Sequence, residues 1–175
     1  KAIEVTGATY YFETVEAAKA KFTELNSTVT AQNANTATNV YFVNWTDSNS
    51  EEITADNFAS KFSETYKKLT ITANWGNKVS FKVTTSNASV TIAGTTVSSG
   101  STVYHVPGSI AIGVTYSESD NRSITINGGS CGNKTAAGTY TFNAGDKVTV
   151  NASSKSSICL VEGTLITLAD GTQKK

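Results

Sequence analysis

The stretch VSFKVTTSNASVTI at residues 79–92 determines the fold class of this chain. Apolar residues alternate with polar ones over 79–83 and again over 90–92. Alternation with a period of two is typical of a strand that buries one of its faces. Ser86-Asn87 between the two runs is a turn signal. The stretch therefore predicts two short strands joined by a turn.

The same pattern continues toward the C-terminus. Apolar residues alternate with polar ones over 110–114, 124–126 and 148–150, and the segments between these runs are rich in Gly, Asn and Ser. Turn signals spaced by about 8 to 12 residues are typical of sandwiches and barrels. We therefore expect residues 77–152 to form an antiparallel β-sandwich or an open barrel.

Residues 14–25 contain the one helical pattern. Apolar residues recur at helical spacing between Val15 and Leu25, and the residues among them are good helix formers. Thr14 can cap the first turn, and Asn26-Ser27 is expected to end the helix. Runs at 10–12, 39–45 and 69–75 are rich in aromatic and β-branched residues and predict strands. The fold class is therefore mainly β with one helix (α+β).

Composition limits the functional classes. The 175-residue chain has a formal net charge of zero and a pI near 6.8, so it lacks the positive charge that nucleic-acid binding requires. No run approaches the roughly 18 consecutive apolar residues of a membrane span, and residues 1–4 lack the apolar core of a secretory signal. We expect a mature or excised soluble piece of an extracellular or cell-surface bacterial protein.

The segment VYFVNWTD at 40–47, followed by Ile53-Thr54 and by LTITANW at 69–75, resembles the internalin-type B-repeat of bacterial surface proteins. The resemblance implies a small β-grasp-like unit over residues 1–76 that spaces or presents other domains. VTIAGTTV at 90–97 and the later alternating runs resemble the short Ig-like β-repeats of bacterial envelope proteins. The resemblance implies an Ig-like domain over 77–152.

The stretch CLVEGTLITLADG at 159–171 resembles the opening motif of the Hint family, the self-processing domains of inteins and bacterial intein-like proteins. The resemblance implies that Cys159 is a nucleophile that attacks the carbonyl of Ile158. The family takes its acid and base from later motifs that do not follow Cys159 here, so we expect a vestigial nucleophile and no catalysis. Residues 153–175 are then a linker and a truncated Hint start. The plainer alternative is a strand and a hairpin turn at Asp170-Gly171.

Two tryptophans are candidate ligand-binding residues. Trp45 and Trp75 could stack on the apolar face of a sugar ring while nearby amides and hydroxyls bind its hydroxyl groups. Both also fall in strands with apolar neighbours, so packing in the core is the favoured alternative.

We expect neither a metal nor a cofactor. His105 is the only histidine and is expected on a strand beside Tyr104. Asp47, Asn49 and Glu51 alternate as calcium ligands often do, but the loop lacks the glycine and the closing carboxylate of a calcium loop, so a solvated acidic turn is favoured.

Cys131 and Cys159 could form one disulfide in an oxidising compartment, whereas a nucleophilic Cys159 must be free. The favoured function is a non-enzymatic surface module, stalk-like or adhesin-like, with a surface glycan or protein as possible partner. One alternative is a self-processing precursor with an N–S acyl shift at Ile158-Cys159, and the other is a carbohydrate-binding module. The ligand and the oligomeric state do not follow from the sequence.

Overall fold

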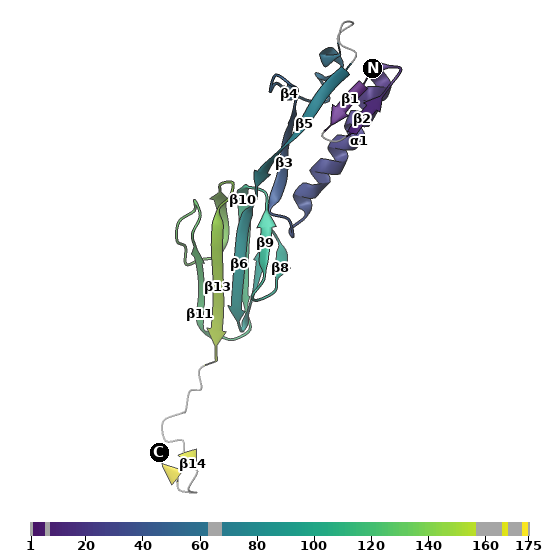
Figure 1. Cartoon of the computed structure of the whole chain (residues 1–175). Coiled ribbons are helices and arrows are strands. Elements are labelled where there is room, and N and C mark those ends of the chain that lie inside the picture. Colours follow the sequence, from purple (N-terminus) through teal and green to yellow (C-terminus); the bar gives the residue numbers. More distant parts are fainter. Residues whose placement is uncertain (1, 6–7, 63–67, 157–165, 168–172, 175) are drawn as a thin grey trace.

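A computed structural model describes residues 2–5, 8–62, 68–156, 166–167 and 173–174, the last two pairs by their backbone alone. The chain forms two β-rich units stacked lengthwise, with one long helix in the first unit (Figure 1). The predicted fold class, mainly β with one helix, is confirmed. Within the described part of the chain, no helix has the length and hydropathy of a membrane span.

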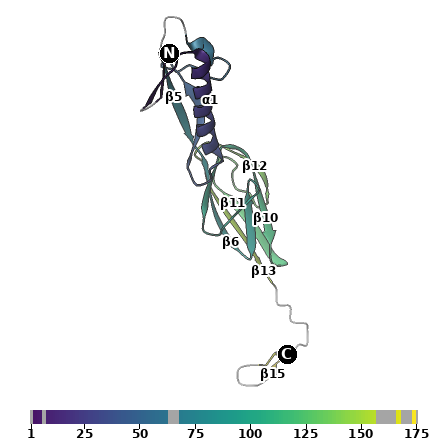
Figure 2. The same ribbon diagram turned by 90° about the vertical axis from the view of Figure 1, so that its right-hand side faces the viewer.

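The first unit is a five-stranded sheet with the helix along one face (Figure 2). Its elements are β1 (Ala2–Val5), β2 (Ala8–Tyr11), α1 (Val15–Ala31), the 3-10 helix η1 (Gln32–Ala34), β3 (Val40–Thr46), β4 (Glu52–Ile53), the 3-10 helix η2 (Phe58–Lys61) and β5 (Lys68–Asn77). The strand order is β2-β1-β5-β3-β4, and the β1–β5 pair is parallel while the others are antiparallel. The three predicted strands correspond to β2, β3 and β5.

Strand β1 is not foreseen by the sequence pattern. It is only four residues long, and its pairing partner β5 is far away in the sequence, with Ile3 opposite Leu69. Ile3 is fully buried in the core of the unit. Long-range pairing thus turns a short run with no strong alternation into an interior strand of the sheet.

Helix α1 begins as predicted and ends later. Thr14 Oγ1 accepts the amide N–H of Ala17 at 3.1 Å, which confirms the cap. The helix passes the predicted stop at Asn26-Ser27 and continues to Ala31. Asn26 does not compete for the local backbone because its side-chain oxygen accepts the indole N–H of Trp45 at 3.1 Å. Val29, one turn after Leu25, also packs against the core, so burial extends the helix.

Aromatic rings fill the space between α1 and the sheet. Phe22 stacks on Phe58 with centroids 4.7 Å apart, and Phe58 meets Phe62 edge to face at 5.2 Å. Phe58 is fully buried although it lies in the short helix η2, which is part of a connection between strands. The core therefore depends on a connecting segment as well as on the regular elements.

The second unit is a β-sandwich of two four-stranded sheets. Its strands are β6 (Val79–Ser86), β7 (Ala88–Ile92), β8 (Thr95–Val97), β9 (Thr102–His105), β10 (Gly108–Tyr116), β11 (Asp120–Asn127), β12 (Gly138–Phe142) and β13 (Lys147–Lys155). One sheet has the order β12-β10-β7-β8 and the other β11-β13-β6-β9. The predicted alternation is confirmed, since Val79, Phe81 and Val83 are all fully buried between the sheets. Phe81 meets Phe142 of the opposite sheet edge to face at 5.1 Å.

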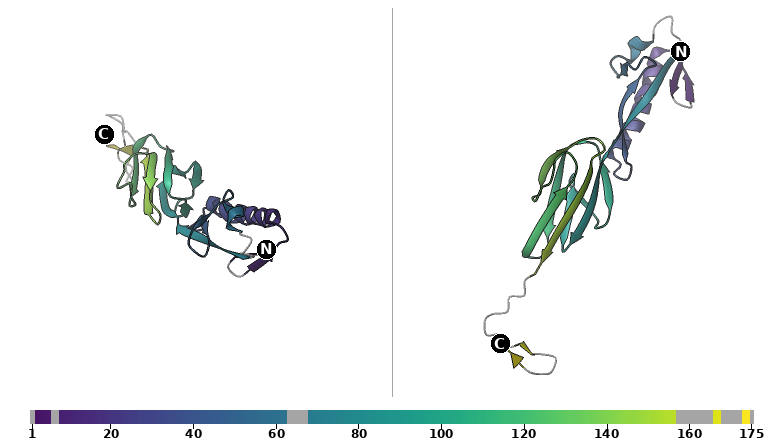
Figure 3. Two further views of the ribbon diagram at one scale, coloured as in Figure 1. Left: turned by 90° about the horizontal axis from the view of Figure 1, so that it is seen from above. Right: turned by 60° about the vertical axis from the view of Figure 1, so that its left-hand side comes forward.

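The first and last strands of the sandwich are parallel, whereas the sequence analysis expects only antiparallel pairs. Lys147 lies opposite Ser80, and Ser153 lies opposite Ser86. Both strands begin at the end of the sandwich that meets the first unit and run away from it (Figure 3). The chain therefore enters the sandwich at one end and leaves it at the other.

The segment between β11 and β12 crosses from one sheet to the other. β11 pairs with β13, and β12 pairs with β10. Asp146 stabilises the crossing because its carboxylate accepts the amide N–H groups of Ser130 at 2.8 Å and Asn143 at 2.9 Å. Burial by itself raises the pKa of Asp146. The hydrogen bonds together have the larger effect, so the pKa of Asp146 lies below its usual value.

The chain passes from the first unit to the sandwich through one residue, Lys78. Gly76 and Asn77 end β5, and β6 begins at Val79, so the passage lies one residue after the predicted boundary between residues 76 and 77. Gly76 lies beneath the ring of Tyr41, and an added Cβ would lie 2.6 Å from Tyr41 Cε1. A larger residue at this position would have to displace the Tyr41 ring, which lies directly on the backbone.

Lys78 joins the two units. Its side chain is 3% exposed, and Nζ donates to the carbonyl oxygens of Gln32 at 3.1 Å and Asn35 at 2.6 Å and to Thr38 Oγ1 at 3.5 Å. Burial lowers the pKa of Lys78. The oxygens of Gln32 and Asn35 also accept from the Asn35 amide at 3.1 Å and from Thr38 Oγ1 at 3.4 Å, respectively. Carbonyl oxygens at the end of a helix carry partial negative charge and have two lone pairs, so they suit a buried ammonium group as a second donor.

Backbone hydrogen bonds complete this joint. The amide of Lys78 donates to Asn39 O at 2.8 Å, and the amide of Tyr104 donates to Thr36 O at 2.9 Å. The segment after α1 is thus attached both to the connecting residue and to strand β9 of the sandwich.

Replacing Lys78 by Met is expected to loosen the joint, because two helix-end carbonyls lose their charged donor. The free energy of unfolding should fall by about 1–3 kcal/mol, and the distance distribution between spin labels at Glu16 and Asn151 should broaden. Electron–electron double resonance on the chain with serine in place of both cysteines measures this distribution. Lys155→Met is the control and should leave it unchanged. An unchanged width in Lys78→Met would show that the ammonium does not hold the units together.

Candidate functional site

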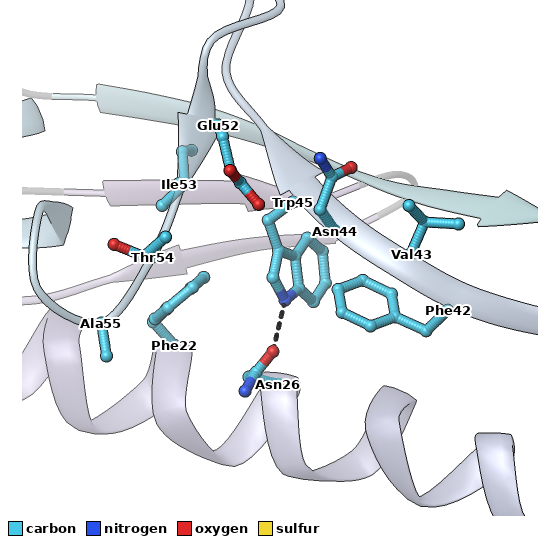
Figure 4. Close-up of a pocket in the computed structure, with 10 residues that line it drawn as sticks. All are labelled: Phe22, Asn26, Phe42, Val43, Asn44, Trp45, Glu52, Ile53, Thr54 and Ala55. Carbon is cyan, nitrogen blue, oxygen red and sulfur yellow. Dashed lines mark hydrogen bonds between the residues drawn. The ribbon is translucent and has the colours of Figure 1, made fainter. Parts of the chain in front are cut away.

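Three aromatic side chains line a hollow between α1 and the strands β3 and β4 (Figure 4). The hollow has a volume of about 220 Å³. Phe22 and Asn26 reach it from the helix, Phe42 and Trp45 from β3, and Glu52 stands at the opposite rim. It is the place where the predicted ligand residue Trp45 comes nearest to solvent.

Trp45 is a core residue in this structure. Its side chain is 3% exposed, its ring lies 5.5 Å from that of Phe42 and 6.0 Å from that of Phe22, and its indole N–H is donated to Asn26. A sugar ring needs an open aromatic face, which Trp45 does not offer. The packing alternative therefore describes Trp45.

Trp75 lies at the surface. It is 44% exposed, pairs across the sheet with Phe42 and meets the Phe42 ring edge to face at 5.9 Å. Phe42 thus lies between the two tryptophans, and the structure does not bring Trp45 and Trp75 into one stacking platform. Only Trp75 has a surface that a ligand could cover.

Several polar groups around the hollow already have protein partners. Asn44 Oδ1 accepts from Asn74 Nδ2 at 3.0 Å, and Thr54 Oγ1 accepts the amide N–H of Asn57 at 3.3 Å. The Glu52 side chain is exposed at the rim. The hollow can admit a small polar molecule, but it does not present a nucleophile beside a base, which group transfer would require.

The acidic loop considered as a calcium site is neutralised by a lysine. Asp47 Oδ1 accepts the amides of Asn49 and Glu51 at 2.9 and 3.0 Å, and Lys61 Nζ bonds to Asp47 Oδ2 at 2.9 Å and also to Glu51. Lys61 and the backbone donors hold the pKa of Asp47 below its usual value. Among the described residues, no group of three His, Cys, Asp or Glu side chains is placed to hold a metal ion. The sequence pattern does not predict the ion pairs of Lys61, because this lysine approaches the loop only in the tertiary structure.

His105 lies on β9 beside Tyr104, as expected. Its ring meets Phe81 edge to face at 6.1 Å. Burial, together with the charge of Lys78, lowers the pKa of His105. The histidine is thus part of the positively charged joint between the units.

Of the two cysteines, only Cys131 lies among the described residues. Cys131 is half-buried and free, its Sγ donates to Gly132 O at 3.1 Å, and burial raises the pKa of its thiol. Cys159, the predicted nucleophile, lies outside the described residues, and so does any disulfide between the two. After it, β14 (Ile166–Thr167) pairs antiparallel with β15 (Gln173–Lys174), and the predicted turn at Asp170-Gly171 lies outside the described residues.

Comparisons with known proteins return no match among family models, curated proteins or solved structures.

The two tryptophans should respond differently to a quencher in solution. Because Trp75 is half exposed and Trp45 is buried, Trp75→Phe should remove most of the emission that iodide quenches, while Trp45→Phe should leave it. Trp45→Phe should also lower the free energy of unfolding by about 1–3 kcal/mol, since it leaves a gap in the aromatic core and Asn26 without its donor. Iodide titration of fluorescence and urea unfolding measure these effects. Equal quenching of the two single-tryptophan variants would contradict the burial of Trp45.

Proposed function

We propose that this chain is a non-enzymatic module of a bacterial cell surface, a stalk-like or adhesin-like spacer that precedes an intein-like segment. The observation that supports this most directly is the lengthwise stacking of two β-rich units around a one-residue passage at Lys78 (Figure 1). A spacer must add length and keep its direction, and both result from this arrangement.

The parallel pairing of β6 and β13 supports a spacer in particular. In a sandwich whose first and last strands are antiparallel neighbours, the chain enters and leaves at the same end. Here the nine-residue strand β13 carries the chain away from the joint, over about 30 Å at roughly 3.3 Å per residue. The sandwich therefore adds its own length to the distance between the two segments of chain on either side of it.

The outer face of the sandwich suits an exposed position outside the cell. Residues that face solvent on β6, β11 and β13 form neighbouring rows of small polar side chains, such as Ser86, Ser153 and Ser123, or Thr84, Asn151 and Thr125. Rows of hydroxyl and amide groups are well hydrated without adding net charge, in keeping with a formal net charge of zero. The resemblances to internalin-type and Ig-like surface repeats point in the same direction.

A surface location is tested on the organism that encodes the chain. We expect antibodies against the purified protein to label intact cells, and brief trypsin treatment of intact cells to release its peptides. A cytoplasmic marker protein is the control and should require permeabilisation in both assays. Labelling that appears only after permeabilisation would overturn the proposal.

The second part of the proposal concerns the segment that begins at Cys159. Its motif and the antiparallel β14–β15 pair support the start of a Hint-like element. Self-processing is the alternative function. Cys159 Sγ would attack the carbonyl carbon of Ile158, the amide nitrogen would leave as an amine, and a thioester would remain. The Thr-x-x-His motif from which the Hint family takes its acid or base does not follow Cys159 within these 175 residues, and the only histidine, His105, lies in the sandwich.

We therefore expect the 175-residue chain to keep its intact mass during incubation with dithiothreitol, because an unactivated thiol exchanges slowly with an amide. Mass spectrometry of wild type, Cys159→Ala and the matched control Cys131→Ala makes the measurement. A fragment that ends at Ile158 as its dithiothreitol thioester, formed in wild type and in Cys131→Ala but not in Cys159→Ala, would favour the self-processing alternative instead.

A further inference from the structure

A second pocket opens at the joint between the units and has a different chemistry from the aromatic hollow. It has a volume of about 290 Å³, near the lower end of the range of about 300–1,000 Å³ that is common for small-molecule sites. Its walls include Asn77 and Lys78 at the change of unit, Tyr104 on β9 and Lys147 on β13. Both units therefore contribute to it.

Lys78 and Lys147 both line the pocket, and the exposed charge is that of Lys147, because the Lys78 ammonium is directed toward the end of the helix. The Lys78 ammonium is buried, and all its hydrogen-bond partners are neutral oxygens. None of the ion pairs formed by the described residues includes Lys78 or Lys147. A buried charge without a counter-charge is costly, and an anion near it lowers that cost.

The nearest acid along the chain does not neutralise this charge. Asp146 precedes Lys147, but its carboxylate accepts the amide of Ser130, in the crossing between β11 and β12, and that of Asn143, in the turn between β12 and β13. No Asp or Glu lines the pocket. Lys82, two residues after the lining residue Ser80 on β6, is exposed and adds further positive charge nearby.

The remaining lining groups are neutral and polar. Asn39, Asn77 and Thr102 are exposed on the walls, Ser80 is half-buried, and Tyr104 supplies an aromatic ring. Amides and hydroxyls match the hydroxyl groups of a sugar, and a tyrosine ring can cover its apolar face. Lysine supplies a point charge for a carboxylate. Together these groups select a sugar that carries a negative charge.

We propose that the joint pocket binds a carboxylate-bearing sugar, a hexuronate unit of an acidic polysaccharide. Lys147 contacts the carboxylate directly, and Lys78 attracts it through its charge while its protons stay on the helix-end oxygens. Because the walls come from both units, the bound sugar also holds the units together. This site is separate from Trp45 and Trp75, and it goes beyond the proposed spacer function without depending on it.

The test uses the full chain and digalacturonate, with the neutral disaccharide galactobiose beside it. Isothermal titration at about 50 mM sodium chloride should show binding of digalacturonate only, and binding should weaken as salt is raised. Lys147→Gln should weaken binding by about tenfold, the loss expected for one charge-assisted hydrogen bond. Lys155→Gln is the matched control, since Lys155 lies on the same face of β13 at its far end, and it should bind like wild type.

Three outcomes would overturn the proposal. These are no binding of digalacturonate at millimolar concentration, an equal loss in Lys155→Gln and Lys147→Gln, or equally tight binding of inorganic phosphate or galactobiose. Amide resonances of Asn39, Asn77 and Tyr104 should shift on binding in wild type, which locates the ligand independently. Lys147 is exposed, so an unchanged melting temperature in Lys147→Gln separates loss of binding from loss of folding. Surface labelling of cells does not depend on this result, so the two proposals fail separately.

Discussion

The buried ammonium group of Lys78 is the contact on which the arrangement of the two units depends. It lies where the chain passes from one sheet to the next, and its N–H groups satisfy carbonyl oxygens just beyond the end of helix α1. A helix end that faces a second unit without partners would be unfavourable, and so would a buried lysine without acceptors. The Lys78 ammonium finds its acceptors in these carbonyl oxygens, and the oxygens gain a charged donor. This contact joins the helix to the sandwich.

The direction of the chain through the sandwich is set by the same joint. β6 starts at the joint because it continues from β5 after one residue, and β13 starts there because Lys147 is in register with Ser80. Because β6 and β13 run parallel, the chain enters the sandwich at one end and leaves it at the other. The spacer function that we propose uses this property, whereas the identity of the loops matters little for it.

Charge is distributed unevenly along this path. In the first unit, the acidic loop at Asp47 is neutralised by Lys61, and Glu4 is paired with Lys68. At the joint, Lys78 and Lys147 have no carboxylate partner among the ion pairs of the described residues. Two lysines therefore line one pocket to which both units contribute and which no acidic side chain lines, so the pocket is a stronger candidate for a ligand than the aromatic hollow at Trp45.

The features that the sequence alone determined are those with local causes. The alternation at 79–83 predicts a strand with one buried face, and Thr14 predicts the start of the helix, because side-chain period and capping act over a few residues. The tertiary structure decided the rest. The strand at Ala2–Val5, the extension of α1 past Asn26, the parallel β6–β13 pair and the burial of Lys78 all depend on partners distant in the sequence. Such contacts stabilise the fold through burial and through the pairing of backbone groups. A local sequence pattern does not show which distant residues will provide them.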